Sequence, residues 1–165
     1  MKTSFITLAA AVAPVAIADF WLTYMSRDVP GAPKLVGGTN QGGVFLKTPE
    51  VSCEESLRQT IYSDSDDVSG NHIGMRTVPG KPAQPPLYRD PLDIVEFNTG
   101  GGNPGHHTIY KDRGYAMFGV DGQKTGQCHE NRTHSFFLKC PDDSDFVYLE
   151  GSTMFFCESK FEVTD

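Results

Sequence analysis

The chain has 165 residues, of which 14 are Lys or Arg and 21 are Asp or Glu, and its formal net charge is −7 at pH 7. This acidic balance excludes a protein that covers nucleic acid with a broad basic face, although it leaves room for a small local phosphate site. The length suits one domain with a substantial core, and no apolar run reaches the roughly 20 residues that span a bilayer, so we expect no membrane partner.

The N-terminus has the pattern of a secretory signal peptide. Lys2 precedes an apolar run from Phe5 to Val15, and Ala16-Ile17-Ala18 matches an A-x-A cleavage signal. We therefore predict a signal peptide over residues 1–18 and a single secreted, extracellular globular domain over residues 19–165.

The best helix candidate is the segment 52–62. Ser52 and Glu55 fit a capping box, in which each residue satisfies a backbone N–H of the other. Cys53, Leu57 and Ile61 recur every four residues and would form one apolar stripe on such a helix.

Short runs rich in β-branched and aromatic residues, separated by turn residues, predict about eight to ten strands. The dipeptide Gly151-Ser152 predicts a two-residue hairpin turn between the last two strands. Because the connections are short, we expect antiparallel pairing. The fold class is mainly β or α+β, an antiparallel sheet or a small β-sandwich with one short helix. The expected strands are residues 20–25, 44–47, 72–78, 93–98, 106–111, 115–120, 134–139, 146–150 and 153–157.

Four cysteines in a chain predicted to be secreted indicate two disulfides rather than a metal site. They are Cys53, Cys128, Cys140 and Cys157, and no C-x-x-C pair occurs among them. Three pairings are possible. We favour Cys128–Cys140 with Cys53–Cys157, which would tie the early part of the domain to its last strand. A tight hairpin at residues 129–133 argues against it, because Cys128 would then lie opposite another residue than Cys140.

The segment between two expected strands at Asn131-Arg132-Thr133 is an N-glycosylation sequon. We predict a glycan at Asn131, which would place this loop on the surface of a glycoprotein.

The stretch from Asp93 to Cys128 holds the residues best suited to chemistry. Within residues 94–97, strand alternation puts Glu96 on one face and its apolar neighbours Val95 and Phe97 on the other. Such a carboxylate is either a solvated surface group or a general base held in a cleft.

A glycine-rich loop, residues 99–105, leads directly to His106 and His107. Neighbours on a strand point to opposite faces, so the two imidazoles do not share one metal ion, and we expect no metal or cofactor. Either of them forms an acid–base pair with Glu96 if their strands are antiparallel neighbours.

Two family resemblances follow from these features. The chain resembles the small secreted, disulfide-stabilised proteins of filamentous fungi. The resemblance rests on the expected signal peptide, the two expected disulfides, the mature size and the style of residues 111–117 leading to residues 126–128. Many members of that class are effectors or surface-interacting proteins. The resemblance implies a location outside the cell and does not imply a mechanism.

The second resemblance is to the fungal guanyl-specific ribonucleases and ribotoxins, small secreted proteins with one helix on an antiparallel sheet. Glu96-Phe97 looks like the general-base glutamate and its aromatic neighbour, and Gly102-Asn103-Pro104-Gly105 looks like the G-x-P-G loop before the strand with the phosphate-binding arginine. Here that strand carries His106 and His107 instead of arginine. The resemblance implies Glu96 as the base, one of these histidines at the phosphate, and His129 as a distant candidate for the acid.

From the sequence we expect a secreted, effector-like binding protein without catalytic activity, whose exposed loops contact an extracellular or host protein or glycan. Tyr88, Tyr110 and Tyr148 are the contact candidates, and we expect a monomer. The alternative is a ribonuclease-like hydrolase, active or catalytically degenerate, with RNA as its partner. A cleft that joins Glu96 to His106 or His107 favours the alternative.

Overall fold

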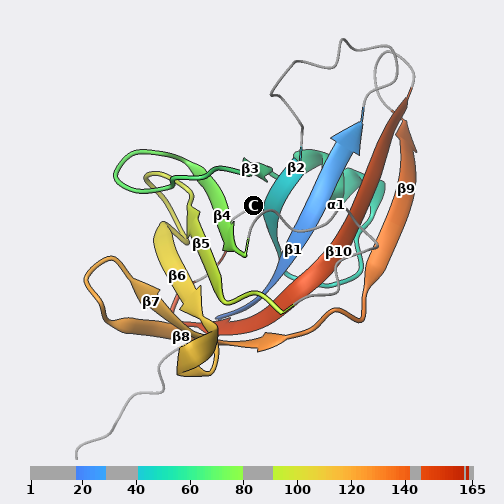
Figure 1. Ribbon diagram of the computed structural model, residues 1–165. Helices are drawn as coiled ribbons and strands as arrows, with labels where there is room; N and C mark the ends of the chain where they lie inside the picture. The colour runs from blue at the N-terminus through green and yellow to red at the C-terminus, as the bar shows by residue number, and fades with distance from the viewer. Residues whose placement is uncertain (1–17, 29–40, 80–90, 142–145, 162, 164–165) are drawn as a thin grey trace, which may run out of the picture.

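The structure is a computed structural model that describes residues 18–28, 41–79, 91–141, 146–161 and 163 (Figure 1). These residues form antiparallel strands and one short α-helix, which confirms the expected mainly β fold. The signal peptide falls mostly on residues outside the described ranges, as does Tyr88. The elements are β1 (Ala18–Asp28), β2 (Gln41–Leu46), α1 (Cys53–Arg58), β3 (Tyr62–Ser63), β4 (Gly74–Val78), β5 (Ile94–Asn98), β6 (His106–Tyr110), the 3₁₀ turn η1 (Lys111–Arg113), β7 (Ala116–Gly119), β8 (Lys124–Glu130), β9 (Ser135–Pro141) and β10 (Phe146–Ser159).

The strands form one sheet that curls into a nearly closed barrel. Its order is β3-β2-β1-β10-β8-β7-β6-β5-β4, and β9 pairs separately with β10. The two ends of this order meet where Asp64 bridges to Met75 and the Ser65 amide donates to the Met75 carbonyl at 2.9 Å. Phe20, Phe97 and Phe155 are among the buried side chains that fill the interior.

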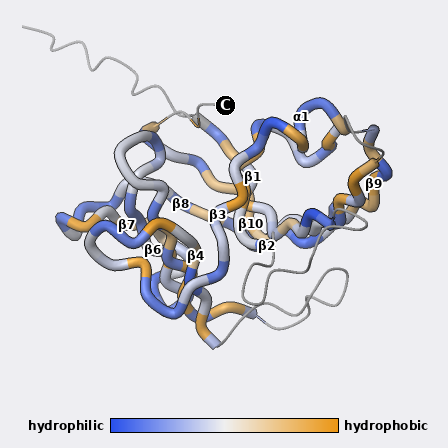
Figure 2. Tube along the Cα trace, turned by 90° about the horizontal axis from the view of Figure 1, so that it is seen from above, coloured by the Kyte–Doolittle hydropathy of each residue, from blue (hydrophilic) through white to orange (hydrophobic). Residues whose placement is uncertain are grey.

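The strand β10 is 14 residues long and holds the two parts of the molecule together. Along one edge it pairs with β1, and along the other edge it pairs first with β9 and then with β8. As a result β4 to β7 lie on one side of the molecule, while α1 and β9 lie on the other (Figure 2).

The predicted hairpin at Gly151-Ser152 is wrong, because β10 continues straight through both residues. Gly151 lies against the ring of Phe136 on β9, and a Cβ atom at this position would collide with that ring. The glycine therefore marks a close approach of a side chain to the strand, which is the other common use of glycine in strands besides turns.

The helix α1 begins as expected, with the Glu55 amide donating to the Ser52 hydroxyl at 3.2 Å. It ends at Arg58, four residues earlier than the end predicted at residue 62. The guanidinium of Arg27 on β1 donates to the carbonyl oxygens of Ser56 at 2.9 Å and Leu57 at 3.3 Å. These are carbonyls that a helix end leaves without intrahelical partners, so Arg27 stabilises the early end.

Two disulfides form, as expected, but the favoured pairing is wrong. The bonds are Cys53–Cys140 and Cys128–Cys157. Cys128 of β8 lies directly opposite Cys157 of β10, whereas β9 pairs with β10 and not with β8. Cys140 therefore lies in the small cluster beneath α1, together with Val147 and Leu149.

We expect each disulfide to contribute several kcal/mol to the free energy of unfolding. The bonded cysteines are 87 residues apart in Cys53–Cys140 and 29 apart in Cys128–Cys157. Chain entropy alone predicts losses of about 5 and about 4 kcal/mol when either pair is replaced by alanine. Urea denaturation of the two double variants measures these losses. A peptide that joins Cys128 to Cys140 in a non-reduced digest would contradict the pairing.

Candidate acid–base site on the outer sheet face

The candidate site lies on the outer face of three neighbouring strands. On β5, Val95 and Phe97 are buried in the core, and Glu96 between them points to the outside of the barrel. The expected alternation is thus observed. In the register of the sheet, Glu96 lies opposite Arg76 of β4 on one side and Thr108 of β6 on the other.

Glu96 contacts two basic side chains at once. One carboxylate oxygen, Oε1, lies 2.9 Å from His106 Nε2, and the other, Oε2, accepts a hydrogen bond from Arg76 Nη1 at 3.2 Å. The side chains of His106, Glu96 and Arg76 are 18%, 21% and 38% exposed. These side chains are thus partly shielded from water but still accessible to a ligand. Partial shielding strengthens the interactions between their charges relative to those at a fully exposed site. We call these three residues the Glu96 cluster.

The Glu96 cluster combines the groups needed to bind and activate a phosphodiester. A carboxylate and an imidazole in contact exchange a proton readily, and each orients the other. The guanidinium of Arg76 supplies a permanent positive charge and planar donors, which suit phosphate oxygens. The cluster therefore fits phosphodiester chemistry better than metal binding.

The line of facing residues that starts at Arg76 and Glu96 continues beyond β6 onto β7 and β8. Thr108 lies opposite Phe118 of β7, and Phe118 lies opposite Lys124 of β8. We call Arg76, Glu96, Thr108, Phe118 and Lys124 the outer row. Beside it, the guanidinium of Arg113 lies 4.6 Å from the ring centre of Tyr110 and 4.9 Å from that of Phe118.

His107 points the opposite way from His106. It is buried between the rings of Phe97, at a centroid distance of 5.7 Å, and Phe161, at 4.7 Å. Its Nδ1 atom is buried without a hydrogen-bond partner among the described residues. Burial and, second, the neighbouring His106 lower the pKa of His107 to about 4, so the imidazole is neutral near pH 7. His107 is a core residue and is separated from Glu96 by the sheet itself.

His129 also lies apart from the Glu96 cluster. It is exposed on β8 and lies opposite Phe156 of β10. The strands β7 and β6 lie between β8 and β5. Three strand spacings of about 4.8 Å put it roughly 14 Å from Glu96 across the sheet alone. The sequence-based candidates thus divide into a pair in contact, Glu96 and His106, and two residues elsewhere.

Sequence reasoning missed Arg76, Phe118 and Lys124. Arg76 lies in the segment 72–78 that was expected to be a strand, and its exposed position follows from alternation with Met75, which is buried. Its neighbour across the sheet depends on the register between β4 and β5, and the long connection between these strands leaves that register undetermined from sequence.

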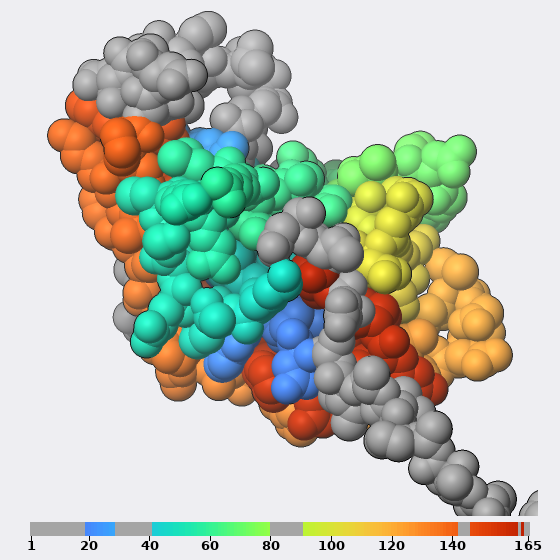
Figure 3. Space-filling model, turned by 180° about the vertical axis from the view of Figure 1, so that it is seen from behind, coloured from blue at the N-terminus to red at the C-terminus, as the bar shows by residue number. Residues whose placement is uncertain are grey.

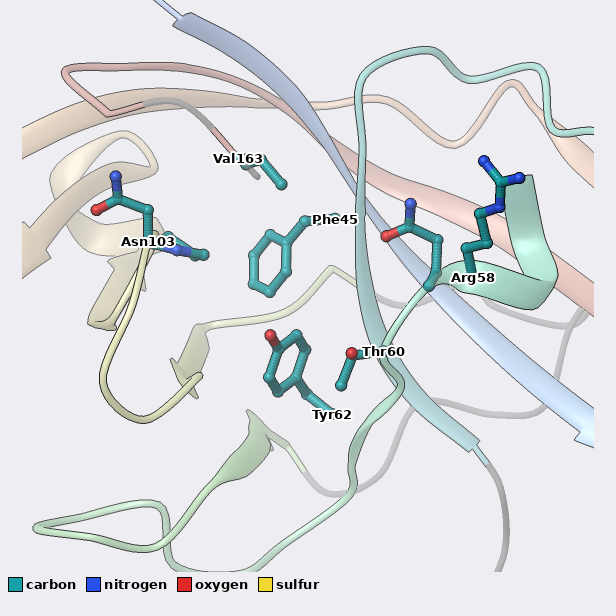
Figure 4. A pocket seen from close by; sticks show the side chains of 8 residues that line it. Phe45, Arg58, Thr60, Tyr62, Asn103 and Val163 are labelled. Atoms are coloured by element: carbon teal, nitrogen blue, oxygen red, sulfur yellow. The ribbon is translucent and has the colours of Figure 1, made fainter. Parts of the chain in front are cut away.

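A small pocket lies between β2, α1, β3 and the glycine-rich loop, and none of the residues of the Glu96 cluster lines it. The rings of Phe45 and Tyr62 lie at its centre, with Asn103 of the glycine-rich loop on one side and Arg58 of α1 on the other (Figure 4). Burial raises the pKa of the Tyr62 hydroxyl, which even at its ordinary value is a protonated donor at neutral pH. The glycine-rich loop thus lines this pocket.

The sequon lies in the connection from β8 to β9. The hydroxyl of Thr133 donates to Asn131 Oδ1 at 2.6 Å, and Thr133 is exposed. Glycosylation of Asn131 stays a prediction.

Comparison of the chain with family models, with curated proteins and with solved structures gives no match. In the part of the chain that the structure describes, no helix has the length and apolarity needed to cross a membrane. In the same part, no group of three His, Cys, Asp or Glu residues is arranged to hold a metal ion. The assignment of the site therefore depends on the chemistry of its residues alone.

The buried His107 predicts a loss of stability in acid. Its pKa is about 4 when folded and near its ordinary value of 6.5 when unfolded, so only the unfolded chain binds this proton between these pH values. The contribution of the neutral His107 to the free energy of unfolding is fully present above pH 6.5. It is lost as the pH falls toward 4, and the total loss is about 3 kcal/mol. Urea denaturation of the wild type and of His107→Leu at pH 7, 5.5 and 4 tests this. The two proteins should diverge in their pH dependence, and parallel curves would contradict the prediction.

Proposed function

We propose that the protein is a secreted, extracellular binding protein that takes single-stranded RNA on the outer face of β4 to β8. The observation that carries the proposal is the outer row. It arranges a cation, a carboxylate with its imidazole, a hydroxyl, an aromatic ring and a second cation along neighbouring strands of one face.

The cations of this face match a phosphate backbone. Arg76 and Lys124 lie at the two ends of the outer row, and Arg113 lies beside its middle. Together with Glu96, which pairs with Arg76, these three cations have a formal charge of 3 − 1 = +2, on a chain of net charge −7. Contacts of this kind supply most of the affinity for nucleic acid and make it depend on salt.

The aromatic rings match the bases. Tyr110 and Phe118 lie 6.0 Å apart and are both partly exposed. Arg113 covers the two rings in the free protein, and its guanidinium plane offers a further stacking surface. Sheet faces that combine aromatic rings with cations are a common way to hold single strands.

The polar groups favour RNA over DNA. Glu96 accepts hydrogen bonds, and Thr108 beside it both donates and accepts. The ribose 2′-hydroxyl is the group that distinguishes the two nucleic acids, and it needs partners of this kind.

Removing the ring of Phe118 should weaken RNA binding. Loss of one stacking ring costs about 1–3 kcal/mol, so the dissociation constant of Phe118→Ala should rise about 5- to 150-fold. Fluorescence anisotropy with a labelled mixed-sequence RNA decamer measures it, and the DNA decamer of the same sequence should bind more weakly than the RNA.

A pair of matched lysine variants separates this face from general charge. Lys124→Gln should weaken binding and reduce the slope of log K against log salt by about 0.7, the value for one phosphate contact on a single strand. Lys139→Gln, which removes an exposed lysine from β9, is the control and should bind as the wild type does. Equal losses in both variants, or no RNA binding by the wild type, would contradict the proposal.

The contact between Glu96 and His106 favours cleavage of the bound RNA as a second candidate function. In such a reaction Glu96 accepts the proton of the 2′-hydroxyl, whose oxygen attacks the adjacent phosphorus. The product is a 2′,3′-cyclic phosphate, and the leaving 5′-oxygen takes a proton from water. Arg76 and His106 stabilise the negative charge of the transition state by donating hydrogen bonds.

Cleavage predicts different effects for Glu96, His106 and His129. Glu96→Gln and His106→Ala should each slow cleavage about 100- to 10,000-fold, the range for loss of an acid–base group. His129→Ala should leave the rate unchanged, because His129 lies outside the cluster. The readout is cyclic-phosphate product from a labelled RNA, with the oxidised protein. Cleavage of equal rate in all variants would indicate a contaminant and would eliminate this second function.

A further inference from the structure

The outer edge of β9 is an unusual surface. β9 pairs with β10 along seven successive residues, from Ser135 opposite Ser152 to Pro141 opposite Phe146. On its other edge, β9 has no strand neighbour in the described ranges. It forms the outermost strand of the molecule both from the front and from behind (Figures 1 and 3).

Soluble proteins usually protect such an edge, because its unpaired backbone groups bind other strands. The protective devices are short length, bulges, proline, and outward charges, lysine above all. β9 has seven residues, and its register with β10 contains no shift. Pro141 stands only at its last position, and the Lys139 Nζ atom is folded back to 3.7 Å above the ring of Phe146. Cys53 Sγ of α1 lies 3.8 Å from the Lys139 carbonyl oxygen, and no strand in the described ranges covers the middle of this edge.

An apolar side chain adds to this exposed edge. Phe137, near the middle of β9, is 66% exposed, and its ring stacks on Tyr148 of β10 at 5.7 Å. Its neighbours Phe136 and Leu138 point to the opposite face and pack in the cluster beneath α1. Phe137 thus extends the aromatic surface of β10 out to the free edge.

We propose that two copies of the chain pair through their β9 edges and form a twofold dimer with one continuous sheet. A strand paired antiparallel with its own copy is self-complementary, because residue i contacts residue j and residue j contacts residue i. A register centred on Leu138 places Phe137 opposite the partner's Lys139 on both sides of the axis, where the lysine reaches the ring by leaving Phe146. The same strand thus offers backbone groups, an apolar ring and a charge that match those of a second copy.

The proposed dimer differs from the monomer expected from the sequence and is independent of the proposed RNA binding. β9 and the outer row lie on different parts of the sheet, since β9 pairs with the first half of β10 and β8 with the second half. Two copies joined at β9 leave both outer rows accessible.

Sedimentation velocity between 2 and 200 µM, with the oxidised full domain, tests the proposal. The wild type should shift from monomer to dimer across this range. Phe137→Asp should raise the dimer dissociation constant at least tenfold. The matched control is Val120→Asp, which introduces the same charge at a valine that is 78% exposed in the turn after β7, and it should dimerise as the wild type does.

Amide hydrogen exchange identifies the surface used. The backbone amides within residues 135–140 that point away from β10 should be more protected at 200 µM than at 2 µM in the wild type, and equally unprotected at both in Phe137→Asp. A monomer at all concentrations, or a dimer that Phe137→Asp leaves intact, would overturn the proposal. So would strong protection of these amides at 2 µM, which would show that the chain itself covers the edge.

Discussion

Backbone hydrogen bonding along β10 is the constraint on which the rest of the structure depends. One strand of 14 residues pairs with β1 along one edge and with β9 and β8 in turn along the other. The barrel with its outer row is built on the second half of β10, and the part with β9 and α1 is built on the first half. Each disulfide joins two segments within one of these parts, Cys128–Cys157 in the barrel and Cys53–Cys140 beside α1. The covalent links therefore reinforce each part rather than joining the two.

Features set by local chemistry were predictable from the sequence, and features set by the pairing of distant segments were not. Alternation around Glu96, the cap at Ser52 and the pairing of the strands on either side of the glycine-rich loop depend on neighbours in the chain, and the structure shows all three. The cysteine pairing, the straight course of β10 through Gly151 and the position of Arg76 opposite Glu96 depend on register between segments far apart. Periodicity contains no information about that register.

The two adjacent histidines show how one strand serves both the core and the surface. His106 contacts Glu96 on the outside, while His107 lies between Phe97 and Phe161 on the inside. A polar ring in the core costs free energy when one of its nitrogens has no partner. β6 thus carries the imidazole of His106 on its outer face and the destabilising imidazole of His107 on its inner face. A shift of the strand by one residue would only exchange the two histidines between the faces.

The division of β10 near Gly151 also bears on how such a chain changes during evolution. A substitution in β9 reaches the outer row through β10, because β9 has no other strand neighbour in the described ranges. A substitution in α1 has a second route, through β3 and the bridge from Asp64 to Met75 beside Arg76. The outer surface of β9 is therefore free to diverge, lengthen or shrink while the barrel stays the same. Among descendants of this chain, the two halves of a single strand would accumulate substitutions at different rates, with the change of rate at the glycine beneath Phe136.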